Sequence, residues 1–189
     1  MNYRSWGALA LLAAAGATSA FGQLLSVGIK GGVPLNDGFV ETGTSEPNFP
    51  LPSTTTNRYI IGPEAELRLP FHLGVEADAL YRHYNVNGSG ISQWEFPILL
   101  KYRFKGIPLV RPFVDAGPTF NHVSDINFLT LNSSTAGIAI GAGLDFHALL
   151  FHITPEFRYT HWGSRNIQAA SGNVYSNQNE TEFLVGLTF

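Results

Sequence analysis

The sequence predicts an all-β protein: an eight-stranded antiparallel up-and-down transmembrane β-barrel with short turns at one end and long loops at the other. Three observations lead to this prediction. Eight stretches alternate apolar and polar residues with a period of two. Each is close to the roughly 9–11 residues that a tilted strand needs to cross a bilayer. The connections between them alternate in length.

The segment 94–104, WEFPILLKYRF, shows the alternation most clearly. Every second residue from Trp94 to Phe104 is large and apolar, and the residues between them include Glu95 and Arg103. A period of two predicts a strand with two chemically opposite faces. The eight predicted strands are 24–33, 58–69, 73–84, 93–104, 109–120, 136–146, 151–162 and 181–189.

The connections form two classes. The short ones are 70–72, 105–108 and 147–150, and the long ones are 34–57, 85–92, 121–135 and 163–180. The long loops are rich in Gly, Pro, Asn, Ser and Thr, which favour turns and polar loops. Short turns at one end and long loops at the other are typical of outer-membrane barrels. The periplasmic end is then the short-turn end, and the extracellular end carries the long loops.

Four prolines lie inside predicted strands, where each removes a ladder hydrogen bond. They are Pro63, Pro97, Pro112 and Pro155. We expect bulges or local breaks at these positions, mainly toward strand ends.

The two faces of the strands differ completely in charge. In each strand we call the alternate positions that are mostly apolar the apolar parity, and the positions between them the opposite parity. The apolar parity carries no Asp, Glu, Lys or Arg, and the opposite parity holds nine acids and eight bases. This near balance favours internal pairing over an ion-selective ring. Since an eight-stranded barrel is just wide enough to be filled by side chains, we predict a plugged lumen. The predicted lumen network is Lys30, Glu64, Glu66, Arg68, Glu76, Asp78, Arg82, Glu95, Lys101, Arg103, Arg111, Asp115, Asp145, Glu156, Arg158 and Glu182, with Arg58 on the same parity.

The strand at 136–146 is nearly bare on its charged parity, where Gly141 and Gly143 stand. This leaves volume for long neighbours such as Arg111 and Arg158.

Aromatic residues indicate which face meets lipid. In the segment 94–104 they lie toward the ends of the apolar parity, from Trp94 to Phe104, with Ile98 and Leu100 between them. Membrane barrels place aromatic girdles at both interfaces around an aliphatic band. The apolar face is therefore predicted to face lipid.

The N-terminus predicts export. Residues 1–22 contain one early cation, Arg4, an apolar run from Trp6 to Ala17, and then small residues. This is the layout of a secretory signal peptide, and the run is shorter than the roughly 20 residues of a membrane anchor. Cleavage is expected after Ala20 or Gly22, which leaves 23–189 as the barrel domain.

Composition excludes several classes of function. A net charge of −3 gives no electrostatic basis for binding nucleic acid. The absence of cysteine excludes disulfides, thiol catalysis and cysteine-ligated zinc. Of six histidines, His147 and His152 flank a short turn without an acid or a third histidine at ligand spacing. We expect no cofactor, no metal site and a monomer.

Five stretches, EFPILLKYRF, VRPFVDAGP, GAGLDF, PEFRYTHW and EFLVGLTF, resemble the small outer-membrane β-barrel domain proteins of Gram-negative-type bacteria, the group related to the OmpA membrane domain and OmpX. The resemblance covers residues 24 to 189. It implies a position in the outer membrane, surrounded by outer-membrane lipid. It also implies that the barrel-assembly machinery reads the last strand through Phe189, with Phe183, Val185 and Leu187 on the same face.

The stretch RYTHWGSRN, 158–166, resembles the region that carries the catalytic His and Ser of outer-membrane lipid A deacylases. That likeness implies His161 and Ser164 as a catalytic pair. The family pattern has Ser two residues after His, where this chain has Gly163, and a slip of one residue turns a side chain to the other face of a strand. The competing interpretation is an interfacial His–Trp pair that anchors the strand.

Three functions remain open at this stage. The sequence favours a non-enzymatic structural or surface-interaction protein that uses the loops 34–57, 121–135 and 163–180. The alternatives are a lipid A acyl hydrolase and a narrow, porin-like channel.

Overall fold

The computed structural model describes residues 24–36, 39–41, 54–86, 89–107, 109–123, 133–148, 151–165 and 174–189. The predicted signal peptide at 1–22 lies outside these residues, so its cleavage stays a prediction. In the part of the chain that is described, no helix is long and apolar enough to cross a membrane.

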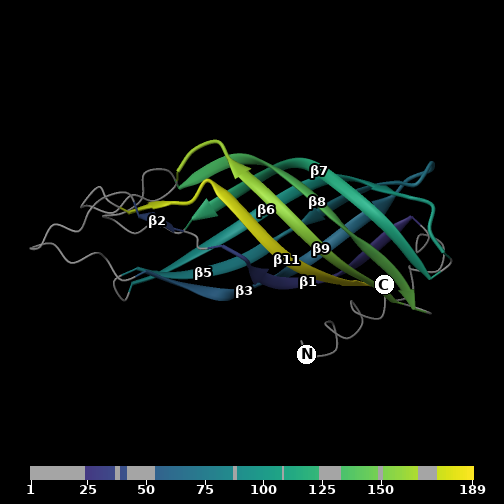
Figure 1. The fold of residues 1–189 in the computed structure, drawn as a ribbon, viewed down its shortest axis with the longest axis horizontal. Coiled ribbons are helices and arrows are strands. Elements are labelled where there is room, and N and C mark those ends of the chain that lie inside the picture. The colour runs from purple at the N-terminus through teal and green to yellow at the C-terminus, as the bar shows by residue number, and fades with distance from the viewer. Residues whose placement is uncertain are drawn as a thin grey trace, which may run out of the picture.

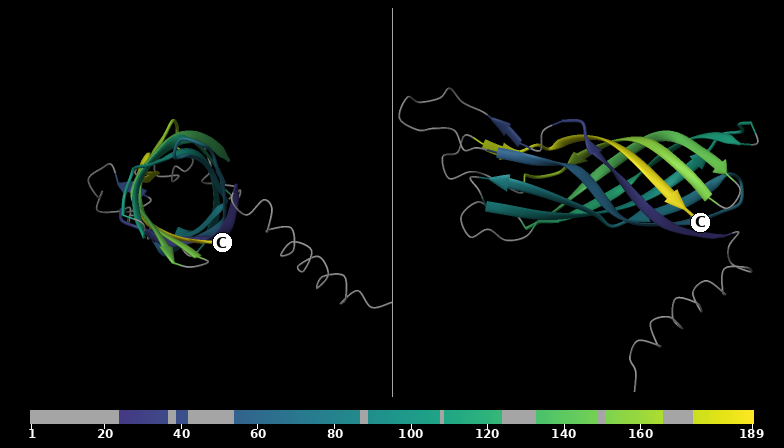
Figure 2. Two further views of the ribbon diagram at one scale, coloured as in Figure 1. Left: turned by 90° about the vertical axis from the view of Figure 1, so that its right-hand side faces the viewer. Right: turned by 90° about the horizontal axis from the view of Figure 1, so that it is seen from below.

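Eight long antiparallel segments close into a barrel, seen side-on in Figure 1 and as a ring in Figure 2. Each pairs with the next, and β1 pairs with both β3 and β11, which closes the wall without a free edge. The predicted fold is confirmed. The segments are β1 (Leu25–Pro34), β3 (Thr54–Arg68), β4 (Leu73–Asp78) continued by β5 (Leu80–Val86), β6 (Ser89–Arg103), β7 (Val110–Val123), β8 (Ser134–Ala148), β9 (Phe151–Trp162) and β11 (Asn179–Thr188).

Two details at the long-loop end differ from the prediction. β2 (Phe39–Glu41) pairs with β10 (Val174–Ser176), so the first and last long loops share a small two-stranded sheet. The predicted loop 85–92 is largely strand, because β5 and β6 continue until Val86 pairs with Ser89.

Three of the four prolines interrupt the ladder locally. Ala79, which separates β4 from β5, donates its N–H to the carbonyl of Pro63 at 3.0 Å, and Pro63 has no N–H with which to return the bond. The β6–β7 ladder skips two pairs beside Pro97, and the β8–β9 ladder does so beside Pro155. The register is unchanged across each gap, so the predicted local breaks are present. The expectation that the breaks lie near strand ends was wrong, because all three lie within strands. Pro112, the third residue of β7, lies near a strand end but pairs with Leu144 in a continuous ladder.

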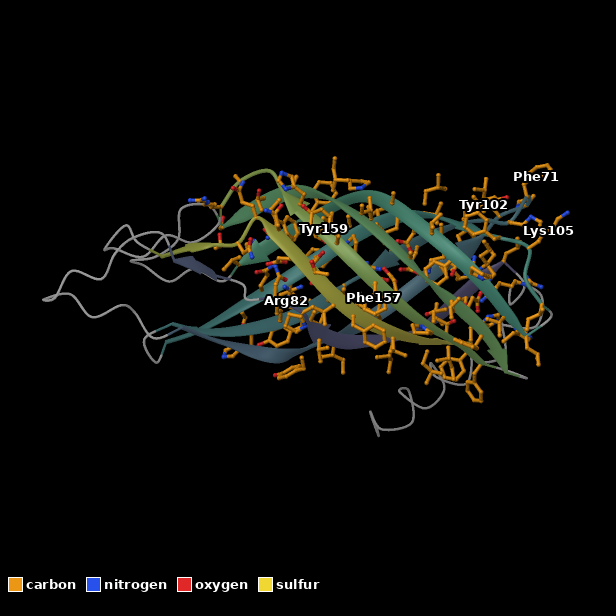
Figure 3. All side chains as sticks on the ribbon, in the orientation of Figure 1. Phe71, Arg82, Tyr102, Lys105, Phe157 and Tyr159 are labelled. Carbon is orange, nitrogen blue, oxygen red and sulfur yellow. The ribbon has the colours of Figure 1, made fainter. Side chains whose placement is uncertain are left out.

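The two faces of the wall have the polarity that the alternation predicts. Along β6 the outward side chains are 40% exposed at Trp94 and 55% exposed at Leu100, whereas Glu95 and Lys101 are 1% and 0% exposed. Apolar groups therefore cover the outside of the barrel, and the charged side chains of the strands lie mainly inside it (Figure 3), together with buried apolar residues such as Leu99 and Phe113.

Aromatic residues are concentrated toward the two ends of the barrel but are not confined there. Tyr102 lies toward the short-turn end and Tyr159 toward the long-loop end, with Phe157 between them (Figure 3). The Phe157 ring lies 4.9 Å, centroid to centroid, from that of Phe183 on the neighbouring strand. The outer band therefore contains an aromatic pair that the girdle pattern did not predict.

The turn between β3 and β4 uses an unfavourable backbone conformation. Phe71 and His72 have φ of 64° and 67°. They are the central residues of a four-residue turn in which the Leu73 N–H donates to the Pro70 carbonyl at 3.4 Å. Left-handed geometry at both positions matches the type I′ hairpin turn, which favours Asn-Gly because a Cβ is strained there.

Replacing Phe71 and His72 together by Asn and Gly is therefore expected to stabilise the barrel by about 1–2 kcal/mol. The measurement is the midpoint of urea unfolding in lipid vesicles. A double alanine variant at these positions keeps both Cβ atoms and should gain no stability. If it were stabilised as much as the Asn-Gly variant, removal of the exposed Phe71 ring, and not relief of the backbone strain, would be the cause.

Candidate functional site

Lys30 of β1 is the hub of a central charged cluster in the lumen. Its Nζ lies 3.2 Å from Glu64 of β3 and 3.2 Å from Glu156 of β9. It lies 3.3 Å from Asp78 and also contacts Glu76, both on β4. The Lys30 side chain is 0% exposed and the four carboxylates are at most 3% exposed. One buried ammonium group therefore holds carboxylates from three strands.

Arg158 of β9 connects opposite walls of the barrel. Its Nη1 donates to Asp78 Oδ2 at 3.0 Å, and its Nη2 donates to Glu76 Oε1 at 3.1 Å. In the closed strand order β4 is as far from β9 as any strand can be. These bonds therefore cross the full width of the lumen. Arg158 Nε also donates to Glu156 Oε1 at 2.6 Å on its own strand.

Lys101 of β6 completes the central cluster. Its Nζ contacts Glu76 and lies 3.9 Å from Asp115. Neither oxygen of the Asp115 carboxylate has a hydrogen-bond partner in the described part of the chain. A Cβ added at Gly141 would lie 2.4 Å from Asp115 Oδ1 and 2.7 Å from Glu156 Oε1. The absence of a side chain at Gly141 of β8 thus leaves room for the carboxylates of Asp115 and Glu156.

A second cluster surrounds Arg82 of β5, nearer the long-loop end. The guanidinium lies 3.0 Å from Glu180, 3.4 Å from Glu95 and in contact with Glu182. Thr119 Oγ1 donates to Glu95 at 3.1 Å. Sequence reasoning missed Glu180, which is 5% exposed, because the last strand begins at Asn179 rather than at 181. Extending the alternation of that strand by one step would have found it.

A third cluster lies at the short-turn end. Arg103 Nη2 donates to Glu66 at 2.5 Å, and its Nε donates to Asp145 at 2.8 Å. Arg68 lies 3.9 Å from Glu66, and its Nη1 is 3.2 Å from His152 Nε2. Two bases here meet two acids, so this cluster is balanced.

Among the described residues, the buried charges are not balanced, contrary to the prediction. The central cluster has five carboxylates and three bases, and the cluster around Arg82 has three carboxylates and one base. Strand parity decides which face a base occupies but not its depth. The side chain of Arg68 is 27% exposed. Arg111, the second residue of β7, is exposed and has no ion pair within the described residues. The Arg58 side chain lies outside the described set.

Fourteen of the sixteen predicted network residues are buried, and each of these belongs to one of the three clusters. They are Lys30, Glu64, Glu66, Glu76, Asp78, Arg82, Glu95, Lys101, Arg103, Asp115, Asp145, Glu156, Arg158 and Glu182.

The proposed catalytic pair is not joined. His161 Nδ1 shares a hydrogen bond with Asn179 Oδ1 at 2.7 Å, and Ser164 Oγ shares one with Thr135 Oγ1 at 2.6 Å. Within the described residues no hydrogen bond connects His161 to Ser164. The His–Trp anchor is wrong as well, because Trp162 points into the lumen and is 2% exposed.

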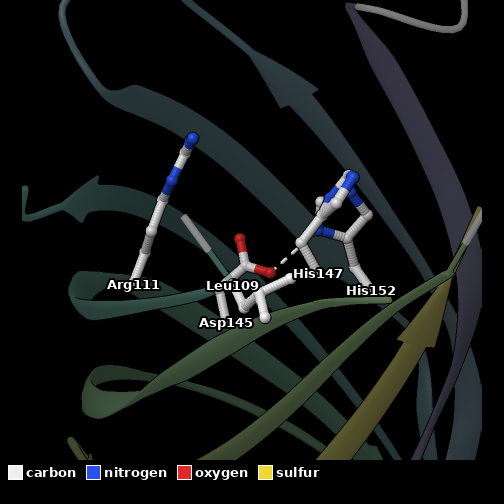
Figure 4. A pocket seen from close by; sticks show the side chains of 5 residues that line it. All are labelled: Leu109, Arg111, Asp145, His147 and His152. Atoms are coloured by element: carbon white, nitrogen blue, oxygen red, sulfur yellow. Dashed lines mark hydrogen bonds and ion pairs between the residues drawn. The ribbon is translucent and has the colours of Figure 1, made fainter. Parts of the chain in front are cut away.

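A small pocket opens at the short-turn mouth of the barrel (Figure 4). Its lining includes Arg111, Asp145, His147 and His152. His147 lies directly opposite His152 in the β8–β9 ladder, and Asp145 shares their face. Linear spacing placed no acid in ligand position for these histidines, but Asp145 Oδ1 lies 2.8 Å from His152 Nδ1. Reading the hairpin as a cross-strand pair, rather than as linear spacing, would have shown it.

No protein-family model matches the chain, and no curated protein matches it. Among solved structures it is similar to Neisserial surface protein A (NspA), with 14% identity, 87% of this chain and 95% of that chain covered, and a TM-score of 0.61. It is also similar to the outer membrane protein OprG from Pseudomonas aeruginosa, with 15% identity, coverage of 88% and 94%, and a TM-score of 0.54. Identity this low shows the fold alone. The chain has the fold of the small eight-stranded outer-membrane β-barrels.

Proposed function

We propose that this chain is a non-enzymatic, integral outer-membrane β-barrel protein with a plugged lumen. The observation that carries the proposal is the pair of bonds from Arg158 to Asp78 and Glu76, at 3.0 and 3.1 Å, across the width of the barrel. Lys30 ties the same carboxylates to further strands. Because these side chains hold one another in the centre of the lumen, they block a continuous water path.

The surplus of buried acids makes a cation-selective channel the competing function. Surplus negative charge attracts cations, but conduction also needs an open path with weak binding. The crossing bonds of Arg158 oppose such a path, which is why we favour the plug.

The role of the protein is then structural or one of surface interaction, through the loops 34–57, 121–135 and 163–180. The wall and the lumen network account for the stability of the barrel, and these loops are left to meet partners outside the cell. We propose export by the signal peptide at 1–22 and recognition by the barrel-assembly machinery at the last strand. The outward residues Phe183, Val185, Leu187 and Phe189 would be read there, and the Phe189 side chain is 60% exposed.

The test is a heat-modifiable gel shift of the refolded barrel followed by single-channel recording in planar bilayers. We expect a shift on heating, which reports a folded barrel, and no conductance steps. A variant lacking 42–53 and 166–173 should behave identically, because closure depends on the wall and the lumen. A general diffusion porin in the same bilayers serves as the positive control. Regular conductance steps from shift-positive protein would refute the plug, and loss of the shift in the loop variant would give the loops a role in folding.

A further inference from the structure

We propose that His147, His152 and Asp145 form a binding site for a divalent transition-metal ion at the short-turn mouth of the lumen. The two imidazoles would be the ligands, and Asp145 would orient one of them. All three groups lie on the β8–β9 hairpin and none belongs to the bonds that cross the lumen, so failure of the site would leave the proposed function of the barrel unaffected.

The hairpin brings three metal-competent groups into one chain of contacts. His147 Nδ1 lies 2.9 Å from His152 Nε2, and His152 Nδ1 lies 2.8 Å from Asp145 Oδ1. The His147 and His152 rings are 4.3 Å apart, centroid to centroid, and nearly perpendicular. The His147 side chain is exposed at the mouth, so an ion can enter from that end (Figure 4).

Asp145 prepares His152 as a ligand. A carboxylate accepts only, so Nδ1 of His152 must carry the proton of that bond, and Nε2 presents a lone pair. Metal-binding histidines commonly donate their second N–H to a carboxylate in this way, which fixes the ring and raises its basicity. Asp145 is itself held by Arg103 Nε at 2.8 Å and its side chain is only 5% exposed. The first ligand is therefore oriented before any ion arrives.

The spacing of the two nitrogens suits an ion in place of a proton. Zn–N bonds of about 2.0–2.1 Å at tetrahedral angles put two nitrogen ligands roughly 3.3 Å apart. His147 Nδ1 and His152 Nε2 are now 2.9 Å apart. To bind the ion, His147 must first move the proton of this hydrogen bond from Nδ1 to its other ring nitrogen, Nε2, an exchange that solvent can carry out at this exposed residue. A shift of a few tenths of an ångström then converts the imidazole hydrogen bond into a two-histidine site, with water completing the coordination shell. Imidazole ligands favour Zn²⁺, Cu²⁺ and Ni²⁺ over Mg²⁺ or Ca²⁺.

Two arginines oppose the ion. Arg68 Nη1 lies 3.2 Å from the same His152 Nε2, and Arg111 lines the pocket. An entering ion must displace Arg68, whose partly exposed side chain can withdraw toward solvent. Arg68 therefore competes with the metal for the lone pair of His152 Nε2. If the histidines bind a metal, removal of the Arg68 guanidinium should tighten that binding, whereas a purely structural hydrogen-bond chain predicts no such gain.

The test uses the complete mature barrel, without a histidine tag, refolded in detergent at pH 7.5. Zn²⁺ is titrated by calorimetry, and Co²⁺ is added separately because its visible spectrum reports tetrahedral coordination. We expect one ion per chain and a loss of at least tenfold in affinity for His147→Ala and for His152→Ala. Asp145→Asn should weaken binding by about 10–100-fold, as partners of metal-bound histidines do. Arg68→Met keeps the aliphatic stem and should tighten binding about tenfold.

His122→Ala and His161→Ala are the matched controls, because both side chains lie at the long-loop end and bond elsewhere, to Ser134 and Asn179. Neither change should alter binding. The heat-modifiable shift confirms folding of every variant. The site is refuted if Zn²⁺ does not bind below millimolar concentration, if either histidine variant binds as well as the parent, or if Arg68→Met does not tighten binding.

Discussion

Replacing Lys30 with Met will lower the free energy of unfolding of the barrel by about 3–5 kcal/mol, the range for breaking a buried ion pair from one side. The ammonium group lies within 3.3 Å of four buried carboxylates. Methionine fills similar volume but leaves those carboxylates facing one another with fewer cations. The measurement is reversible urea unfolding in lipid vesicles, followed by Trp fluorescence.

A double-variant cycle with Glu64 isolates the electrostatic part of this loss. Among the described residues, the one ion pair of Glu64 is with Lys30. Glu64→Gln alone should therefore lower the free energy of unfolding only slightly, since it also reduces the acid surplus. When it is combined with Lys30→Met, it should restore part of the stability that Lys30→Met removes. Lys105→Met, at an exposed position in a short turn, is the control and should have no effect. Equal losses for Lys30→Met with and without Glu64→Gln would mean that packing, not charge, makes Lys30 important.

The wall of the barrel could be predicted from sequence because strand geometry is local. Successive side chains alternate between the two faces of a strand. In a run such as 94–104 the sequence alone therefore predicts which side chains point inward and which point outward, whichever strands are its neighbours. The six outward residues of that run are all exposed, as the alternation predicted. Turn lengths then fixed the up-and-down order, since short connections join neighbouring antiparallel strands.

The pairing inside the lumen could not be predicted, because it depends on register and on which strands stand opposite. Arg158 meets Asp78, 80 residues away in the chain, only because closure puts β9 across from β4. The alternation also does not predict how deep in the lumen an inward side chain lies. Arg111 and Arg103 share the inward parity, yet Arg111 lies at the mouth while Arg103 bonds Glu66 and Asp145. Among the described residues, the predicted neutrality failed partly for this reason and partly because the last strand begins early enough to bring Glu180 inside.

The histidine pocket shows the same limit at short range. His147 and His152 are only five residues apart, and linear spacing gave no ligand set. The turn between β8 and β9 puts them opposite one another and brings Asp145 beside His152. Cross-strand neighbours, not sequence neighbours, decide the chemistry of a barrel mouth.

Replacing Gly32 with Val will prevent normal closure of the barrel. A Cβ at Gly32 would lie 2.1 Å from the carbonyl oxygen of Phe183 and 2.8 Å from the Cα of Leu184, both on β11. These are backbone atoms, so no side chain can move aside to relieve the clash. β1 and β11 form the seam that joins the first strand to the last. We expect a loss of about 3 kcal/mol, at the upper end of overpacking costs, and loss of the heat-modifiable shift.

Gly31 is the matched control, because it differs from Gly32 by one residue and points to the other face. A Cβ there would meet nothing nearer than the carbonyl oxygen of Ile60 at 3.5 Å, an ordinary contact. Gly31→Val also adds apolar surface to the lipid-facing parity, so it should fold and shift normally. If both valines abolished folding, β1 would need glycine for backbone freedom along its length. If only Gly32→Val does so, the close approach of β1 to β11 is what requires a residue without a side chain.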